Sequence, residues 1–424
     1  MIFVAEPLRA WHGQGVRLLA VALAFLVLAP AAGAWTTVPG AVENIVVPSM
    51  LVTQAGTVLV SFESPTGDTI SVARNHGAPA VVYANDPIAG RTQLLQQPNG
   101  AIQLYFPDAQ GVGRMTSIDD GQTWSGPLQT LSHDVGGVEG AAIGPDGTPY
   151  FTQDGTGFVN VFRGIGGEAS ANVYTSCCGY DSTIAVDAGA LVQVAFYSNA
   201  TSTGTFQYEP LGPSLSPTAS IPLGPTVEHS PRVPLVSDRS GNTFLAWAPG
   251  NPTAIGVTVV PFRGGTPVGD GVTFKSTFSG SDPHMALAVD ANDRLWIVWT
   301  GQGKLHAARS RSHGAHFGAV VTSPLPGTAY QVSAAALAGS VDVIVNTGSG
   351  LSEAQLDPGL SVHVTKVGKH HVVQALDDGF PVPSATFTVA GHTYHANAAG
   401  KATVPSGAGK AAAAGYVGAA FRIP

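Results

Sequence analysis

Charged residues are scarce in this sequence, and it shows no helical pattern. Only 11% of the 424 residues are charged, well below the roughly 25% that is usual in soluble domains. Apolar residues do not recur every three to four positions, so the chain is not expected to form helices. Its 53 glycines and 31 prolines are typical of short strands joined by many turns.

An excess of positive charge is also missing. The formal net charge is −8, and an acidic surface repels the phosphate groups of nucleic acids and lipids. We therefore expect neither nucleic acid nor an anionic membrane surface as a partner.

Residues 1–34 have the features of an export signal. Arg9 and Arg17 precede an apolar run from Leu18 to Ala29, and Ala32 to Ala34 form a small-residue cleavage site. The apolar run is short for a membrane span. We expect cleavage, a mature chain of net charge −9 without a membrane span, and a secreted or cell-surface location. Retention of this segment as an anchor is the alternative.

A repeat of 42 to 52 residues dominates the rest of the chain. Each unit contains an apolar strand, a turn, a second apolar strand, a polar loop and a third strand. The second strands begin near seven anchor residues: Gly56, Gly100, Gly147, Gly189, Gly241, Asp293 and Gly339. A period in the forties with about four strands per unit is typical of a β-propeller. We predict an all-β fold in which residues 35–366 form a propeller, with seven blades preferred to six.

One unit carries a short turn motif, "SIDDGQTW", from Ser117 to Trp124. We expect Asp119 to accept backbone N–H bonds across the turn, Gly121 to adopt a positive φ, and Trp124 to plug the blade. The motif resembles the Asp box of sialidase-like (BNR) propellers, and "SRSHGAHF" and "ARNHGAPA" are weaker copies of it. This resemblance implies a sialidase-like propeller in which the box residues have a structural role.

The innermost strands of a propeller all start around one mouth of its central channel. Counting eight or nine residues back from the anchors collects side chains that should converge there: Arg91, Glu139, Asp181, Arg232, His284 and Tyr330. Strand starts are often simply solvated, but this set is unusually polar for a chain with so few charges. The sequence therefore predicts a binding site at this mouth.

The sialidase resemblance also extends to single residues. "TAYQVSAAALAG" resembles the segment with the nucleophilic tyrosine of sialidases, which implies Tyr330 as nucleophile, Glu139 as its partner base and Asp68 as acid/base. "VVPSMLVTQAGTVL" resembles the first sialidase blade, but Val46 replaces the arginine that holds the sugar carboxylate. The arginines near the mouth are displaced from the sialidase positions, so the catalytic set is incomplete.

The two cysteines of the chain, Cys177 and Cys178, are adjacent in "TSCCGYDS". An exported pair is expected to oxidise, and neighbouring Cα atoms lie only about 3.8 Å apart, so the disulfide would close a strained ring. We predict this vicinal disulfide at the channel mouth beside Tyr180 and Asp181, which are candidate ligand contacts. Two free buried thiols or an intermolecular link are the alternatives. Adjacent sulfurs lack the spacing to share one tetrahedral metal ion.

Residues 369–424 alternate apolar and polar side chains. They resemble small β-sandwich modules of the carboxypeptidase-regulatory or bacterial Ig-like type, including an Ala-Gly-Tyr that ends at Tyr416. The resemblance implies a spacer or an adhesive appendage. His392 and His395 are three residues apart, which on a strand directs them to opposite faces, so we expect no metal site.

The leading interpretation is a monomeric, exported propeller that binds carbohydrate at its channel mouth and uses no cofactor. The candidate ligand contacts are Arg91, Asp181, Arg232, His284 and Tyr180. A glycoside hydrolase of the sialidase type, using Tyr330 and Glu139, is the first alternative. A polysaccharide lyase using Tyr330 and His284, with Arg232 neutralising a uronate, and a purely structural surface protein are the others.

Overall fold

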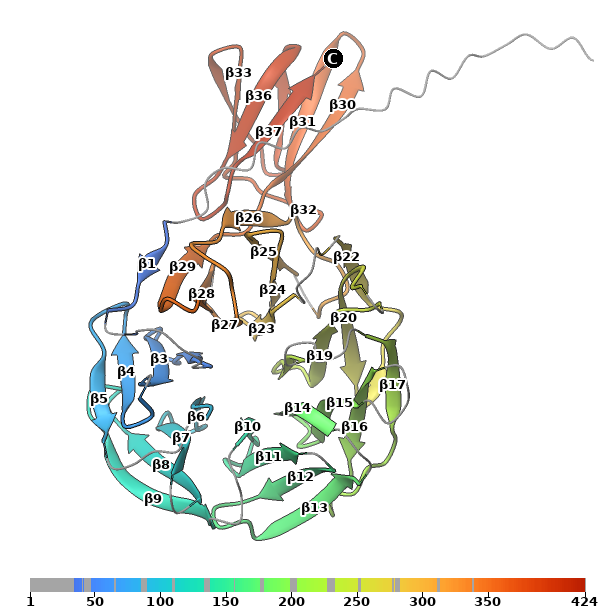
Figure 1. The fold of residues 1–424 in the computed structure, drawn as a ribbon. Coiled ribbons are helices and arrows are strands. Elements are labelled where there is room, and N and C mark those ends of the chain that lie inside the picture. The colour runs from blue at the N-terminus through green and yellow to red at the C-terminus, as the bar shows by residue number, and fades with distance from the viewer. Residues whose placement is uncertain are drawn as a thin grey trace, which may run out of the picture.

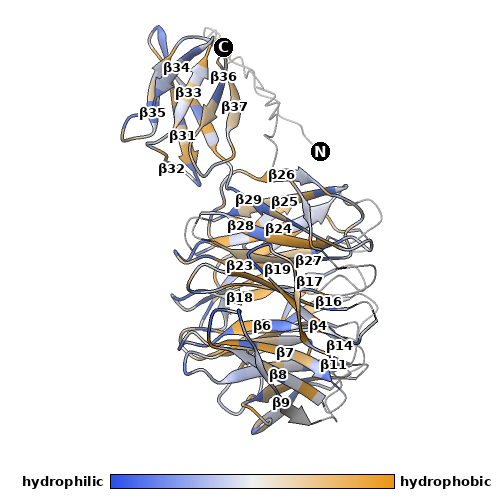
Figure 2. Cartoon of the chain, turned by 90° about the vertical axis from the view of Figure 1, so that its left-hand side faces the viewer, coloured by the Kyte–Doolittle hydropathy of each residue, from blue (hydrophilic) through white to orange (hydrophobic). Residues whose placement is uncertain are grey.

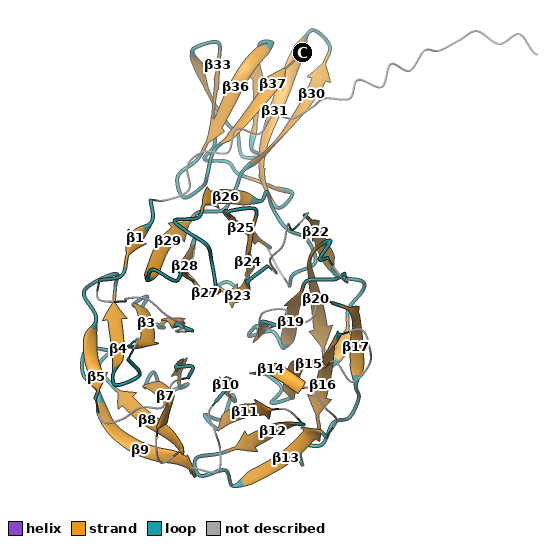
Figure 3. Ribbon diagram, viewed as in Figure 1, coloured by secondary structure: helices purple, strands orange, loops and turns teal. Residues whose placement is uncertain are grey.

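The structure is a computed structural model whose regular elements are all strands (Figure 3). It describes residues 34–423 apart from residues 40, 42–46, 65, 85–89, 109–110, 133–137, 156, 176–178, 199–203, 227–232, 251–252, 277, 279–282, 311–312 and 338. No helix in these described ranges is long and apolar enough to cross a membrane. The predicted all-β fold is confirmed.

The strands form a ring of seven antiparallel blades around a channel, with a separate sandwich outside the ring (Figure 1). Blade one contains β2 (Ser49–Val52), β3 (Val58–Glu63), β4 (Ile70–Arg74) and β5 (Ala80–Tyr83). Blade two contains β6 (Gln93–Gln96), β7 (Ile102–Asp108), β8 (Gly111–Ser117) and β9 (Ser125–Ser132). Blade three contains β10 (Gly140–Ile143), β11 (Pro149–Gly155), β12 (Phe158–Arg163) and β13 (Ala169–Tyr174). Seven blades is the number that the repeat favours.

The remaining blades repeat the same order from the channel outward. Blade four contains β14 (Gly179–Val186), β15 (Val192–Ser198), β16 (Thr205–Leu211) and β17 (Ile221–Pro225). Blade five contains β18 (Leu235–Ser237), β19 (Asn242–Trp247), β20 (Gly256–Arg263) and β22 (Val272–Lys275), with the short β21 (Thr266–Pro267) also paired to β20. Blade six contains β23 (Met285–Val289), β24 (Leu295–Gly301), β25 (Lys304–Arg309) and β26 (Val321–Pro324).

Blade seven joins the two ends of the propeller. It contains β27 (Gln331–Ala336), β28 (Val341–Asn346) and β29 (Leu351–Leu356), and its outermost strand is β1 (Thr36–Thr37) from the start of the described chain. Thr36 pairs with Glu353 and Thr37 with Ser352 in antiparallel register. The pairing of β1 with β29 joins the start of the described chain to the last blade, which closes the ring.

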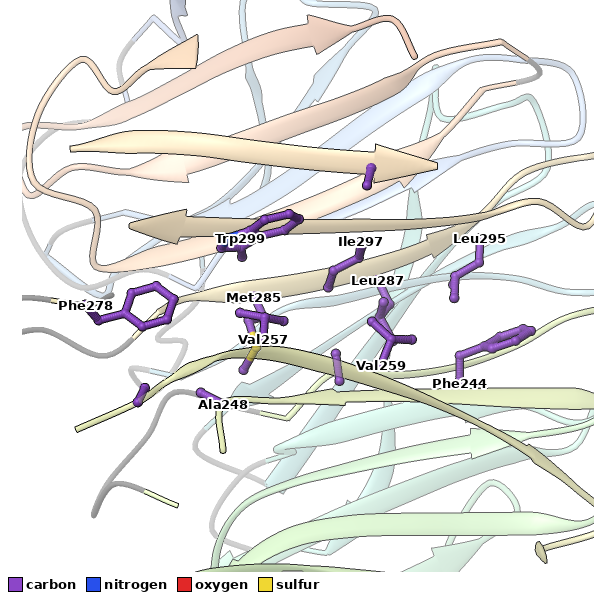
Figure 4. Packing of buried hydrophobic residues seen from close by; sticks show 13 residues of the cluster. Phe244, Ala248, Val257, Val259, Phe278, Met285, Leu287, Leu295, Ile297 and Trp299 are labelled. Carbon is purple, nitrogen blue, oxygen red and sulfur yellow. The ribbon is translucent and has the colours of Figure 1, made fainter. Parts of the chain in front are cut away.

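Hydrophobic side chains fill the space between every pair of neighbouring blades. Successive residues of a strand point to opposite faces, so the second strand of a blade packs against both neighbours. In β24, Leu295, Ile297 and Trp299 face blade five, where they join Phe244 (Figure 4). Burying a side chain of this size stabilises the fold by about 1.5–3 kcal/mol. These clusters make the ring rigid and hold the strand starts in place.

The C-terminal module is a two-layer sandwich with its own core. One sheet contains β30 (Ser361–Val367), β31 (His370–Asp377), β32 (Phe380–Pro381) and β35 (Lys401–Val404), and the other contains β33 (Thr386–Val389), β34 (His392–His395), β36 (Gly407–Ala412) and β37 (Ala419–Ile423). Phe387 and Phe421 meet edge to face between the layers. The sequence pattern starts this module at residue 369, but β30 pairs along its whole length with β31, so the strand Ser361–Val367 also belongs to it.

A buried arginine joins the sandwich to the ring. Arg309 of β25 is only 3% exposed and forms an ion pair with Asp377 of β31, with 2.5 Å between Nη2 and Oδ2. Its Nη1 donates to the Gly339 carbonyl of blade seven at 3.0 Å. Its guanidinium lies between the rings of Trp296 and Tyr416, 5.5 and 5.7 Å from their centroids. One side chain therefore links blade six, blade seven and the sandwich.

The "SIDDGQTW" motif forms the turn between β8 and β9, the third and fourth strands of blade two. The Asp119 carboxylate accepts the N–H groups of Gln122 and Thr123 at 3.1 and 2.9 Å and the Ser117 hydroxyl at 2.8 Å. The Thr123 hydroxyl also donates to Asp119, at 2.5 Å, and this bond is the largest cause that lowers the pKa of Asp119 to about 2, followed by the Thr123 N–H and the Ser117 hydroxyl. Gly121 has φ 81°, and a Cβ there would lie 2.7 Å from the Leu59 side chain. The motif therefore stabilises a turn that packs against blade one.

We expect Asp119→Ala to lower the melting temperature by about 2–4 °C, because the turn would lose four acceptor contacts. Differential scanning calorimetry measures this change. Asp270→Ala, at an exposed aspartate with no hydrogen bond in the described structure, is the matched control and should melt like the wild type. Equal melting temperatures for both variants would contradict a structural role for Asp119.

Candidate functional site

The central channel contains a hollow of about 250 Å³ to which all seven blades contribute. Its walls are residues in the innermost strands or just before them, among them Ser49, Arg91, Thr183, His284 and Gln331. These segments come from distant parts of the chain, and they meet because the innermost strands run parallel to one another around the axis. The starts of the innermost strands therefore converge as the repeat predicts.

Three of the predicted residues form one charged cluster at this mouth. Arg91, just before β6, places Nε 2.8 Å from Glu139 Oε2 and Nη2 3.3 Å from Asp181 Oδ1. The three residues belong to blades two, three and four. The Arg91 side chain is 12% exposed, and its Nη1 is buried without a partner in the described structure. A planar guanidinium thus holds two carboxylates that remain partly open to solvent.

Sequence reasoning missed a fourth member of this cluster, Asp154 at the end of β11. Burial, followed by the charge of Glu139, raises the pKa of Asp154 to about 6. The backbone N–H of Ser182 donates to its Oδ2 at 2.5 Å. The sequence "YFTQDG" could have revealed Asp154, because it ends the second strand of its blade. A second strand ends at the same mouth where the next innermost strand begins.

The raised pKa makes the stability depend on pH. Asp154 binds its proton more tightly in the folded chain than in the unfolded one, so its contribution is present at low pH and is lost as pH rises through about 6. We expect Asp154→Asn to be more stable than the wild type above this pH, by about 1–3 kcal/mol, and nearly equal to it at about pH 4.

Urea denaturation across this pH range measures the difference between the two proteins. His284 has the opposite pH dependence, because burial lowers its pKa and its protonation at low pH destabilises the folded chain. That contribution is the same in both proteins, so subtracting the wild-type curve removes it. A constant difference between the curves at every pH would contradict this prediction.

His284 lies at the mouth as predicted, but it is apart from the charged cluster. It precedes β23. Burial lowers its pKa to about 4, although a hydrogen bond with the Ala329 backbone raises the pKa in part. Its Nδ1 is buried without a partner among the described residues. His284 also lines a second hollow of about 480 Å³ beside Thr300 and Leu325. The lowered pKa therefore favours the neutral ring at pH 7.

No hydrogen bond in the described structure joins Tyr330 or Asp68 to Glu139. Tyr330 is 55% exposed and lies against Gly348, and its hydroxyl makes no hydrogen bond to Glu139 in the described structure. Asp68 accepts the hydroxyls of Ser64 and Thr66, both at 2.6 Å, in an exposed loop. The Ser64 bond is the main cause of its lowered pKa, whereas a general acid needs a raised pKa.

The remaining predicted residues have different outcomes. Tyr180 lies in β14 next to Asp181, but it packs into the hydrophobic cluster between blades four and five. Arg232 and the pair Cys177 and Cys178 lie outside the described residues, as does Val46. In the described part of the chain, no group of three or more His, Cys, Asp or Glu side chains could hold a metal ion.

No family model matches this sequence, and no curated protein matches it closely enough to count as a relative. Solved structures do resemble the fold. A catalytically inactive variant of virginiamycin B lyase from Staphylococcus aureus, in complex with quinupristin, aligns with a TM-score of 0.50 and 14% identity over 76% of this chain and 98% of its own. The selenomethionine form of that enzyme aligns with the same TM-score and coverage at 13% identity. The chain has a β-propeller fold.

Proposed function

We propose that this β-propeller is exported and binds carbohydrate at the channel mouth, with Glu139 and Asp181 as the ligand contacts and Arg91 as the residue that orients them. The observation that carries the proposal is the charged cluster that three successive blades build at one mouth, in a chain where charged residues are scarce. Carboxylates held by an arginine offer fixed acceptors and donors, which suit the hydroxyl groups of a sugar. The signal-like residues 1–34 support export.

The cluster favours a neutral sugar over an acidic one. Nε and Nη2 of Arg91 pair with protein carboxylates and its Nη1 is buried, so the guanidinium is not available to a ligand carboxylate. Glu139 and Asp181 outnumber Arg91, and Asp154 adds a further negative charge above about pH 6. An acidic sugar would therefore be repelled at this mouth. Within the described part of the mouth, the same arrangement argues against the sialidase alternative, which requires an arginine free to hold the sugar carboxylate.

The test is a titration of the mature protein with neutral and acidic oligosaccharides, together with an assay for release of aryl sialoside. Binding of a neutral oligosaccharide that Glu139→Gln weakens, with negligible hydrolysis, would support the proposal. Robust hydrolysis that Tyr330→Phe abolishes would overturn it in favour of a sialidase-type hydrolase. Neutral binding that is unchanged in Glu139→Gln would place the ligand elsewhere.

A further inference from the structure

The sandwich contains a hollow of about 870 Å³ that is unrelated to the channel. It lies along β30, the β30–β31 turn and the end of β37, and Ser406 also contributes to its wall. The C-terminal end of β37 and the β30–β31 turn are at the end of the sandwich that points away from the ring (Figures 1 and 2). Its volume is within the range of small-ligand sites.

The ionisable side chains of this hollow are all basic or histidine. They are His363, Lys366, Lys369, His371 and Arg422. Lys366 pairs directly across the sheet from the buried His371, while Lys369 and Arg422 are exposed at the rim. No Asp or Glu lines the hollow. Lys366, Lys369 and Arg422 form no ion pair with any described residue. Cations gathered without counter-charges repel one another, so an anion bound here would relieve that repulsion.

The charge of the module contrasts with that of the rest of the chain. Residues 361–424 contain five Lys and Arg against two Asp, whereas residues 1–360 contain 14 basic and 25 acidic residues. One of the two module aspartates, Asp377, is held by Arg309 at the junction with the ring. The distal hollow is therefore a local positive site on an acidic protein.

We propose that this hollow binds an acidic polysaccharide through its carboxylate or sulfate groups. The Arg422 guanidinium and the two lysines match such anions. Val362 and Val364 supply apolar wall against which a sugar face can pack. A continuous anionic membrane would also repel the acidic propeller, whereas a single polysaccharide chain can enter the hollow and leave the propeller in solvent.

The two binding sites are then opposite in charge and independent of each other. The channel mouth would take a neutral sugar, and the distal hollow would hold the protein on an acidic polymer. This second site does not depend on the proposed function of the first.

The experiment titrates the mature full-length protein with an oligogalacturonate, a dextran sulfate oligomer and a neutral maltooligosaccharide, by calorimetry at low and at high salt. The test variant is Lys366→Gln with Arg422→Gln. The matched control is Lys401→Gln with Lys410→Gln, which removes the same charge from exposed positions of the module outside the hollow. Vesicles containing phosphatidylglycerol form a separate arm.

We expect either acidic oligosaccharide to bind more tightly than the neutral one, and its affinity to fall at least about tenfold in the test variant and with salt. The control variant and Arg91→Ala should both bind it like the wild type. Equal binding by the test variant, binding of vesicles alone, or no binding of either acidic oligosaccharide would each overturn the proposal. Because Lys366 and Arg422 are exposed, the test variant is expected to fold, and Lys369→Gln provides a second, single-site test.

Discussion

Replacing Arg309 with alanine is expected to lower the free energy of unfolding by about 3–5 kcal/mol. The guanidinium is buried between Trp296 and Tyr416, so its removal leaves a cavity as well as an unpaired Asp377 carboxylate. The change would also separate the sandwich from blade six, because Tyr416 and Asp377 both belong to the sandwich. Chemical denaturation measures the stability, and limited proteolysis near residue 358 measures the separation.

Two further variants serve as a control and as a test of the role of the guanidinium group. Arg263→Ala, at an exposed arginine of β20, should change stability by no more than about 0.5 kcal/mol. Arg309→Lys keeps the charge but lacks the planar fork and its stacking, so an intermediate loss is expected. A loss below about 1 kcal/mol for Arg309→Ala would show that the junction contributes little, and unchanged proteolysis would show that other contacts hold the sandwich.

Replacing Arg91 with alanine is expected to weaken the binding of a neutral oligosaccharide at the mouth by about 2–5 kcal/mol. Without the guanidinium, Glu139 and Asp181 lose the partner that orients them, and their charges repel each other and Asp154. Calorimetric titration measures the affinity. The same substitution is expected to reduce stability by about 1–3 kcal/mol, because the ion pairs are only partly exposed.

The separation of these two effects requires matched variants. Arg91→Lys can keep one ion pair but not both, so its affinity should lie between those of the wild type and Arg91→Ala. Asp119→Ala lies in a turn on the opposite side of blade two and should lose stability without losing affinity. Wild-type affinity in folded Arg91→Ala would place the ligand outside the mouth.

Equal offsets from the repeat anchors predicted that Arg91, Glu139 and Asp181 would meet, and the structure brings them within hydrogen-bonding distance. The offsets worked because the turn after the innermost strand has the same form in successive blades: the N–H groups of Gly100, Gly147 and Gly241 each bond to the carbonyl three residues earlier. They could not show that the Arg91 guanidinium pairs with two protein carboxylates and not with a ligand. They also missed Asp154, because it ends a second strand and the offsets follow only the first.

Local pattern determined the repeat, the all-strand fold and the turn of the Asp box, since alternation, glycine and a short acceptor side chain act over a few neighbouring residues. The tertiary structure decided what depends on distant segments: the pairing of β1 with β29, the placement of Arg309 between two modules, and the basic hollow at the sandwich tip. Each of these joins residues from separate strands or modules. Bringing such distant segments together depends on the packing of the whole fold, so no local pattern records these contacts.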